Sequence, residues 1–331
     1  MVNVAIAGGT GGVGRSIVDA LKANGGHNVT ILSRKVSEDV NGYPVIAVDY
    51  DDIDGLRTTL EQHRIHTVIS ALAMHIIGVG KSQLNLIEAA DKSMFTKRFV
   101  VSNWAVRPNF QYMDLLPHGF QHITCYEALP KTSLEWTAFN CGWFLEYYAM
   151  PNVETYIPQT TFVVDMAGLQ AAIPGDGKQK MTFTYTKDAA RFVVAALGLP
   201  KWEQNTYIIG DKMTWEEFVQ VAERARGRTW TAHLISLKTG TDKSLVKGKK
   251  FTVTYDSVEE LKAGKITELP GQIAAYPYFR KEWVQRLFSV FGFWVTEGLF
   301  DLPDDKALHN VFPDIRATTI EEMLTQAWKG Q

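Results

Sequence analysis

The fold is decided by the stretch Gly8-Gly9-Thr10-Gly11-Gly12-Val13-Gly14, close to the beginning of the chain. Residues 2–7 before it form an apolar run, which predicts a strand buried on both faces. Residues 15–22 after it carry apolar side chains at helical spacing. Glycines at positions 8, 11 and 14 permit a tight turn, close approach of the backbone to a pyrophosphate, and close packing of helix on strand. Since a helix N-terminus also presents unpaired N–H groups to phosphate, the stretch predicts a dinucleotide-binding turn.

The residues after the second predicted strand, 28–32, indicate which dinucleotide is bound. They are Ser33-Arg34-Lys35. An NAD-preferring site places Asp or Glu about 20 residues after the glycines, where it binds the ribose 2′-hydroxyl. A guanidinium and an ammonium would instead pair with a 2′-phosphate, and Ser33 would add a hydrogen bond. The sequence therefore favours NADPH over NADH as cofactor.

Strand-like and helix-like patterns alternate through the first third of the chain. Further strands are predicted over residues 45–48, 67–72 and 98–102, and further helices over residues 55–63 and 81–92. This order predicts an α/β fold with a doubly wound parallel Rossmann sheet.

The pattern weakens beyond residue 105. Strands are still predicted over residues 136–139 and 207–209, and helices over residues 188–197 and 214–226. We expect an NADP-binding domain over residues 1–155 with returning segments near 183–212. Residues 156–182 and 213–331 would then form a smaller, interleaved substrate domain.

Composition excludes several classes of protein. The 331 residues carry a net charge of −2 and are 46% hydrophobic, so there is no basic footprint for nucleic acid or an anionic membrane. Two cysteines, Cys125 and Cys141, cannot form a disulfide framework. We see no secretory signal, no apolar run long enough to span a membrane and no His or Cys spacing typical of a metal site. The sequence predicts a soluble, cytoplasmic protein without a metal, as a monomer or homodimer.

Several motifs together resemble those of the NmrA-like and isoflavone-reductase-like family of atypical short-chain dehydrogenases. Besides the glycine stretch they are Val-Asp-Tyr-Asp-Asp at 48–52, Val-Ile-Ser-Ala-Leu at 68–72, Lys-Arg-Phe-Val-Val-Ser at 97–102, Asn-Cys-Gly-Trp-Phe-Leu-Glu at 140–146, Thr-Lys-Asp-Ala-Ala at 186–190 and Phe-Pro-Asp-Ile-Arg at 312–316. The resemblance is firm over residues 1–150 and thins beyond residue 225. It implies an NADP(H)-binding fold with a smaller substrate domain.

The resemblance also implies roles for individual positions. The pyrophosphate would be wrapped by Gly8, Thr10, Gly11, Gly12, Val13 and Gly14, and the 2′-phosphate held by Ser33, Arg34 and Lys35. Asp49 would lie near the adenine, and Ser70, Ala71 and Leu72 would line the cofactor. The nicotinamide end would face Ser102, Asn140, Gly142, Trp143 and Phe144.

One position departs from the family pattern. Reductases of this family carry a lysine after the fifth strand, and the matching position here is His122. The Tyr-x-x-x-Lys pair of ordinary short-chain dehydrogenases is also absent, because Tyr126 is followed four residues later by Pro130. A histidine can donate a proton near neutral pH without a large pKa shift. If residues 120–129 are helical, His122 and Tyr126 share one face and can act as a donor pair; a packing role for both is the alternative.

These observations favour an NADPH-dependent reductase of a hydrophobic aromatic or polycyclic small molecule of the secondary-metabolite type, with His122 as proton donor. Two alternatives stay open: a non-catalytic NADP(H) sensor that binds a protein partner, and a redox-neutral cyclase or isomerase.

Eight aromatic residues lie between positions 276 and 294. They would line a pocket for a flat substrate, form the core of the smaller domain, or make a dimer patch.

Overall fold

The computed structural model describes residues 2–107, 109, 112, 115–116, 119–227 and 249–329. Residues 228–248 of the predicted smaller domain therefore lie outside the described residues. The largest element is a seven-stranded sheet in the order β11-β6-β5-β4-β1-β2-β3, with all neighbours parallel. Its strands are β1 (Asn3–Ala7), β2 (Asn28–Ser33), β3 (Val45–Ala47), β4 (Thr67–Ser70), β5 (Arg98–Val100), β6 (Glu135–Asn140) and β11 (Asn205–Tyr207).

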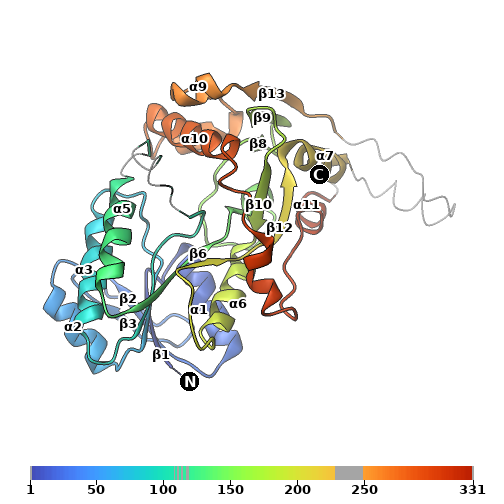
Figure 1. Cartoon of the computed structure of the whole chain (residues 1–331). Helices are drawn as coiled ribbons and strands as arrows, with labels where there is room; N and C mark the ends of the chain where they lie inside the picture. The colour runs from blue at the N-terminus through green and yellow to red at the C-terminus, as the bar shows by residue number, and fades with distance from the viewer. Residues whose placement is uncertain are drawn as a thin grey trace.

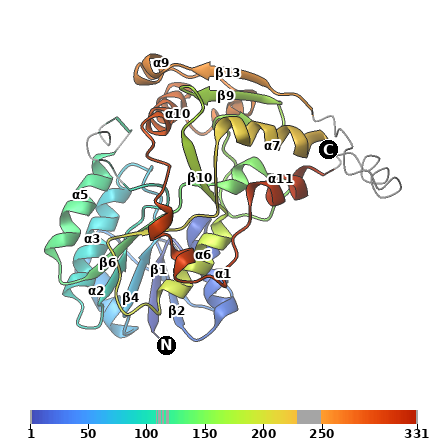
Figure 2. The same cartoon turned by 45° about the vertical axis from the view of Figure 1, so that its right-hand side comes forward.

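Helices cover both faces of this sheet (Figure 2). Helices α1 (Gly12–Asn24) and α6 (Thr186–Ala196) cover one face; α2 (Ile53–Gln62), α3 (Val79–Lys92) and α5 (Phe120–Ala128) cover the other. Side chains alternate along a strand, so Val4 and Ile6 of β1 pack in the core beneath α1 and α6, whereas Ala5 and Ala7 pack in the opposite core. All four are fully buried, which explains the uninterrupted apolar run in the sequence.

A smaller unit lies above the carboxyl edge of the sheet (Figure 1). It contains two three-stranded sheets, in the orders β12-β10-β7 and β13-β9-β8. Its strands are β7 (Trp143–Phe144), β8 (Val164–Asp165), β9 (Gln170–Pro174), β10 (Lys180–Thr184), β12 (Asp211–Thr214) and β13 (Thr252–Asp256), and its helices are α7 (Trp215–Gly227), α9 (Val258–Lys262), α10 (Lys281–Thr296) and α11 (Ile320–Trp328). Because α6 and β11 lie between β10 and β12 in the sequence, the units are interleaved. The predicted doubly wound fold with a smaller interleaved unit is confirmed.

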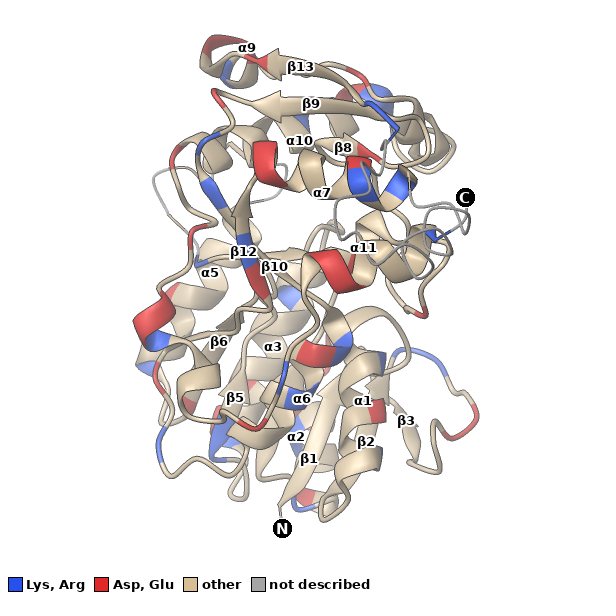
Figure 3. Ribbon diagram, turned by 90° about the vertical axis from the view of Figure 1, so that its right-hand side faces the viewer, with Lys and Arg blue, Asp and Glu red and all other residues tan. Residues whose placement is uncertain are grey.

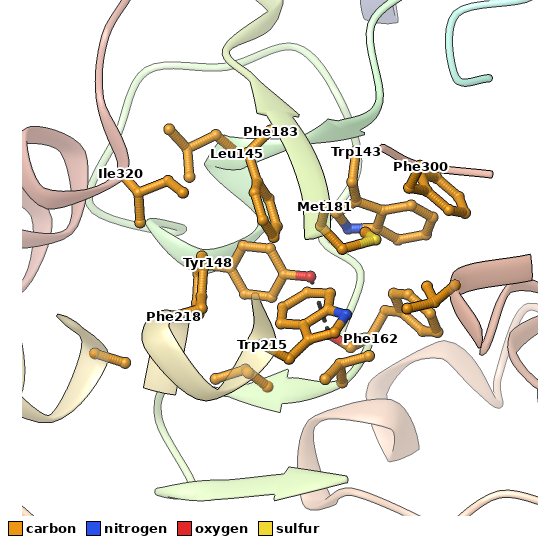
Figure 4. Close-up of a cluster of buried hydrophobic side chains, with 14 of the residues drawn as sticks. Trp143, Leu145, Tyr148, Phe162, Met181, Phe183, Trp215, Phe218, Phe300 and Ile320 are labelled. Carbon is orange, nitrogen blue, oxygen red and sulfur yellow. Dashed lines mark hydrogen bonds between the residues drawn. The ribbon is translucent and has the colours of Figure 1, made fainter. Parts of the chain in front are cut away.

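The core of the smaller unit is aromatic (Figure 4). The ring centroids of Tyr148 and Phe218 are 4.7 Å apart, and those of Phe183 and Trp215 are 5.1 Å apart. The Tyr148 hydroxyl donates to the Phe162 carbonyl oxygen at 3.0 Å, so its polar end is satisfied within the core.

Most of the aromatic residues between positions 276 and 294 contribute to this same core. Phe288, Phe293 and Trp294 are buried members, and Phe291 packs against it, whereas Tyr278 is exposed. The residues therefore contribute to the core of the smaller unit, one of the alternatives that the sequence left open.

Charged residues of both signs are dispersed over the two units (Figure 3). In this view neither the basic nor the acidic residues of the described part of the chain are gathered in one continuous region. Within the described ranges, no helix is long and apolar enough to cross a membrane.

A buried carboxylate joins the units. Glu146, on the 3₁₀ turn Leu145–Tyr148, is fully buried. Its oxygens accept hydrogen bonds from the Thr186 backbone N–H at the start of α6, at 3.2 and 3.3 Å, and from the hydroxyls of Thr186 and Thr155. The Thr186 hydroxyl also lies 3.4 Å from Ser16 Oγ of α1. Burial raises the pKa of Glu146 to about 7 despite these donors.

We predict that Glu146→Gln flattens the pH dependence of stability. The folded protein binds the Glu146 proton more tightly than the unfolded chain, in which the pKa is about 4.5. The carboxylate therefore lowers the free energy of unfolding as pH rises from about 4.5 to 7, by roughly 3 kcal/mol. Urea titrations across this range should show the fall in the native protein and lose most of it in the variant.

Glu154→Gln is the matched control, because Glu154 is an exposed carboxylate paired with Lys187. If the free energy of unfolding of Glu146→Gln falls with pH as steeply as that of the native protein, Glu146 is not the group that titrates in this range.

Candidate active site

The predicted cofactor residues meet at the carboxyl edge of the parallel sheet. Gly8 follows β1, Ser33 ends β2, Ser70 ends β4, Ser102 follows β5, and Asn140 ends β6. Parallel strands present their carboxyl ends at one edge, and the strand order reverses between β1 and β4. Ligands of such sheets bind outside this edge at the switch point, so five separate stretches of sequence converge where a ligand crevice is expected.

The glycine turn is packed too closely for side chains at two positions. Gly8 has φ +83°, and a Cβ there would lie 2.7 Å from the Ala71 carbonyl oxygen. A Cβ on Gly14 would overlap the Gly8 carbonyl oxygen. Glycine at these positions lets α1 begin directly against the end of β1.

The other end of the turn is open, as a bound phosphate requires. No atom of the described residues lies within 4 Å of a Cβ placed on Gly11 or Gly12, and Thr10 and Gly11 are exposed. No side chain in the described part of the chain caps the first turn of α1, and that turn holds no acidic residue. The helix N-terminus therefore presents its N–H groups and positive dipole end to the crevice, a fit for the pyrophosphate of a dinucleotide. Val13 is half-buried and packs on the core beneath α1.

The cations after β2 are available to a ligand. Gly8 donates its backbone N–H to the Leu32 carbonyl oxygen at 3.2 Å, which holds the end of β2 beside the glycine turn. Arg34 and Lys35 are exposed, and neither pairs with a carboxylate of the described residues. The Ser33 hydroxyl oxygen accepts from the Lys35 backbone N–H at 3.3 Å. This cationic turn fits a 2′-phosphate.

The residues after β3 and β4 lie at the same edge. Asp49 is exposed, and its carboxylate accepts the Asp51 backbone N–H at 2.9 Å. Ser70 Oγ is buried without a hydrogen-bond partner among the described residues. Ala71 donates its N–H to the Ala7 carbonyl oxygen at 2.8 Å, and the Leu72 carbonyl oxygen accepts the Ser102 hydroxyl at 2.8 Å. The Ser102 hydroxyl is therefore already bonded within the protein, whereas the Ser70 hydroxyl is left to bind a ligand.

The polar groups after β5 and β6 already bind the protein itself. Ser102 donates its backbone N–H to Gln83 Oε1 at 2.8 Å. Asn140 is fully buried; its side-chain oxygen accepts from Asn103 at 3.2 Å, and its nitrogen donates to the Thr206 carbonyl oxygen at 3.3 Å. Asn140 therefore ties the ends of β5, β6 and β11 together.

The chain leaves the sheet unit directly after Asn140. Gly142 has φ +71°, and a Cβ there would overlap the Thr182 carbonyl oxygen of β10. Beyond it, the Trp143 ring packs in the core of the smaller unit, 4.6 Å from the Phe162 ring (Figure 4). Phe144 packs against the core of the sheet unit.

Helix α5 is held to the crevice by Gln121, a residue that the sequence did not single out. Its side-chain oxygen accepts the N–H groups of Gly78 and Gly80, each at 3.0 Å. Its nitrogen donates to the carbonyl oxygens of Met74 at 3.1 Å and Ile76 at 3.2 Å. All four hydrogen bonds of the amide therefore fix the segment after β4 to the first turn of α5.

His122 is next to this contact and is half-buried. Its Nδ1 is buried without a partner among the described residues. Burial, and secondarily His75, lowers the pKa of His122 to about 4. Burial in the folded chain penalises the imidazolium, an effect that the sequence alone does not show. At pH 7 the ring is neutral and carries one N–H donor.

Tyr126, one turn further along α5, is buried in the core against the sheet. Its ring meets the Trp136 ring edge-on, with centroids 5.9 Å apart. Burial raises its pKa well above the usual value. Among the described residues, no three His, Cys, Asp or Glu side chains gather into a group that could hold a metal ion.

Comparison with known proteins gives consistent matches. The model of the NmrA-like family matches residues 2–269. The oxidoreductase BOA1 of Botryotinia fuckeliana is 38% identical over 244 residues, 73% of this chain and 81% of that relative. The oxidoreductase swnN of Metarhizium robertsii is 30% identical over 99% of this chain and 98% of that relative.

Solved structures share the fold. A structure described as AtPrR2 with NADP+ and (+)pinoresinol superposes with a TM-score of 0.68 at 20% identity, over 98% of both chains. The leucoanthocyanidin reductase–NADPH complex from Vitis vinifera superposes with a TM-score of 0.66 at 16% identity, again over 98% of both chains.

We predict that two glycine substitutions separate ligand binding from packing. Gly11→Ala adds a methyl group where the protein leaves open space, so the free energy of unfolding should fall by about 1 kcal/mol or less. NADPH affinity should nevertheless fall at least about tenfold, because the methyl group takes the place of the phosphate. Gly14→Ala should lower the free energy of unfolding by about 3 kcal/mol, because its methyl group overlaps Gly8. Urea titration and NADPH fluorescence measure the two quantities, and native NADPH affinity in Gly11→Ala would exclude this helix end as the phosphate site.

Proposed function

This chain belongs to the NmrA-like family and, like its curated relatives, is an oxidoreductase; we propose that it transfers a hydride from NADPH to a hydrophobic aromatic or polycyclic small molecule. The accepting atom is a carbonyl or conjugated carbon, and the substrate is of the secondary-metabolite type. One observation carries the proposal: an open, uncapped helix N-terminus lies beside a turn whose two cations form no ion pair with the described residues.

Different residues of the chain would bind the two phosphate groups of the cofactor, the pyrophosphate and the 2′-phosphate. The N–H groups at the start of α1, from Gly12 onward, would bind the pyrophosphate. Arg34 and Lys35 would hold the 2′-phosphate, with Ser33 between them and the sheet. When bound, NADPH supplies a hydride from its nicotinamide ring.

His122 would act on the substrate oxygen. A carbonyl that gains a hydride at carbon develops negative charge on oxygen, which an N–H donor stabilises. With its pKa near 4, about one His122 ring in a thousand is an imidazolium at pH 7, so the neutral ring is the working form. Its N–H would donate to the oxygen and pass on the proton, and the same nitrogen would then take a proton from solvent. Each turnover would consume one solvent proton, so the oxygen gains one proton and the imidazole ends neutral.

Two exposed apolar residues, on α5 and on the segment held to it, favour an apolar substrate. Phe120, two residues earlier on α5, is 62% exposed, and Ile77, in the segment that Gln121 holds, is 74% exposed. Apolar side chains exposed beside a crevice are typical of a site that covers them with a ligand.

The cofactor assignment predicts a selective loss of affinity. Arg34→Ala with Lys35→Ala should weaken NADPH about 10- to 100-fold or more and leave NADH nearly unchanged, because only NADPH carries the 2′-phosphate. Fluorescence titration of both nucleotides measures the difference. Arg57→Ala is the control, since Arg57 lies on α2 in ion pairs with Asp54 and Glu61. An equal loss for both nucleotides would place the phosphate elsewhere.

The proposed function is tested by NADPH absorbance with a panel of aromatic and polycyclic ketones and enones. We expect consumption with at least one, and in that assay His122→Ala should lower kcat about 10²–10³-fold while NADPH affinity stays near the native value. The native rate should not follow a His122 titration between pH 6 and 8, because its pKa is about 4. His63→Ala, at the opposite edge of the sheet, is the matched control.

Three results would count against the proposal. NADPH that stays intact with every compound, together with a protein partner released on oxidation, would favour a sensor. Product without NADPH consumption would favour a redox-neutral enzyme. A folded His122→Ala variant with native turnover would remove His122 from the mechanism.

A further inference from the structure

A second hollow lies in the smaller unit, away from the glycine turn. Its volume is about 440 Å³, within the range of small-molecule pockets. It is bounded by α9 and α10, which pack side by side in the upper part of Figure 1, and by two residues of the segment that leads from β5 to α5. Its lining residues are Tyr112, Leu115, Leu261, Lys262, Arg286, Val290, Phe293 and Glu297.

The floor of this hollow is apolar. Leu261, Val290 and Phe293 are buried, and Leu115 faces them half-buried. The Tyr112 ring stands edge-on to the Phe293 ring at 5.2 Å. These surfaces suit a flat apolar group, which gains by leaving water.

Two of the lining residues are cations without an anionic partner. Arg286 is half-buried, and its guanidinium forms no hydrogen bond or ion pair with the described residues; it passes beside Gly264. The Lys262 ammonium lies 4.9 Å from the centre of the Phe293 ring, and no carboxylate of the described residues lies within ion-pair distance of it. The one acidic lining residue, Glu297, already accepts the Tyr112 hydroxyl at 2.9 Å.

We propose that this hollow is a binding site for an amphipathic carboxylate. The apolar body of the ligand lies on Leu261, Val290 and Phe293, and its carboxylate meets Arg286 and Lys262. Arginine binds a carboxylate through two parallel N–H bonds, and lysine adds a point charge. Its lining residues include none of those assigned above to NADPH or to the substrate, and the proposal does not depend on that function.

The test uses two probes of the same shape, 2-naphthoate and its neutral amide, 2-naphthamide. Calorimetric titrations are made with the full chain saturated with NADP+, so that the cations at Arg34 and Lys35 are already covered. We expect naphthoate to bind at least about tenfold more tightly than naphthamide. Arg286→Gln should remove most of this preference and leave naphthamide affinity within about twofold, and Lys262→Gln should reduce it by a smaller factor.

Lys201→Gln, an exposed lysine of the sheet unit, is the matched control and should bind both probes as the native chain does. Equal affinity for the two probes, or an unchanged preference in Arg286→Gln, would overturn the proposal. Loss of naphthoate binding in His122→Ala would also overturn it, because the probe would then occupy the active site. These measurements are binding affinities and do not require turnover. A negative result in the reductase assay would therefore leave this test unaffected.

Discussion

The close contact between Gly14 and the Gly8 carbonyl oxygen is the constraint on which the rest of the site depends. It lets α1 start directly above the end of β1, so that the helix N-terminus points into the crevice between the strand ends. The other predicted site residues lie at the same edge, because the residues that follow each parallel strand begin at its carboxyl end. The same geometry holds the cationic turn at Arg34 and Lys35 beside the glycines through the pairing of β1 with β2.

The two ends of the crevice differ in physical character. At the phosphate end the protein offers exposed cations and open backbone N–H groups, which suit a strongly charged ligand. At the other end His122 is neutral, and exposed apolar side chains occur on α5 and on the segment that Gln121 holds to it. Gln121 fixes these two segments together with four hydrogen bonds. A charged cofactor end and an apolar substrate end are what hydride transfer to a hydrophobic molecule requires.

Local sequence pattern was enough to predict the sheet unit. Strand β1 is buried on both faces and therefore reads as an apolar run, and the glycine turn after it is typical of a dinucleotide-binding strand–turn–helix. It also placed Arg34 and Lys35 correctly at the end of β2. Contacts between distant residues could not be predicted. The pKa of His122 depends on burial in the folded chain, and Gln121 acts on residues about 45 positions earlier. Nor could local pattern show that the Trp143 ring packs on Phe162 in the smaller unit, beyond the positive-φ turn at Gly142.

The central claim is that a hydride passes from NADPH to carbon in an apolar small molecule. The most direct measurement uses NADPH deuterated at C4 on one face at a time, with mass spectrometry of the product. The account predicts one deuterium per product from one of the two epimers only, and one NADP+ formed for each product molecule. Product that carries no deuterium from either epimer, with NADPH left intact, would contradict it.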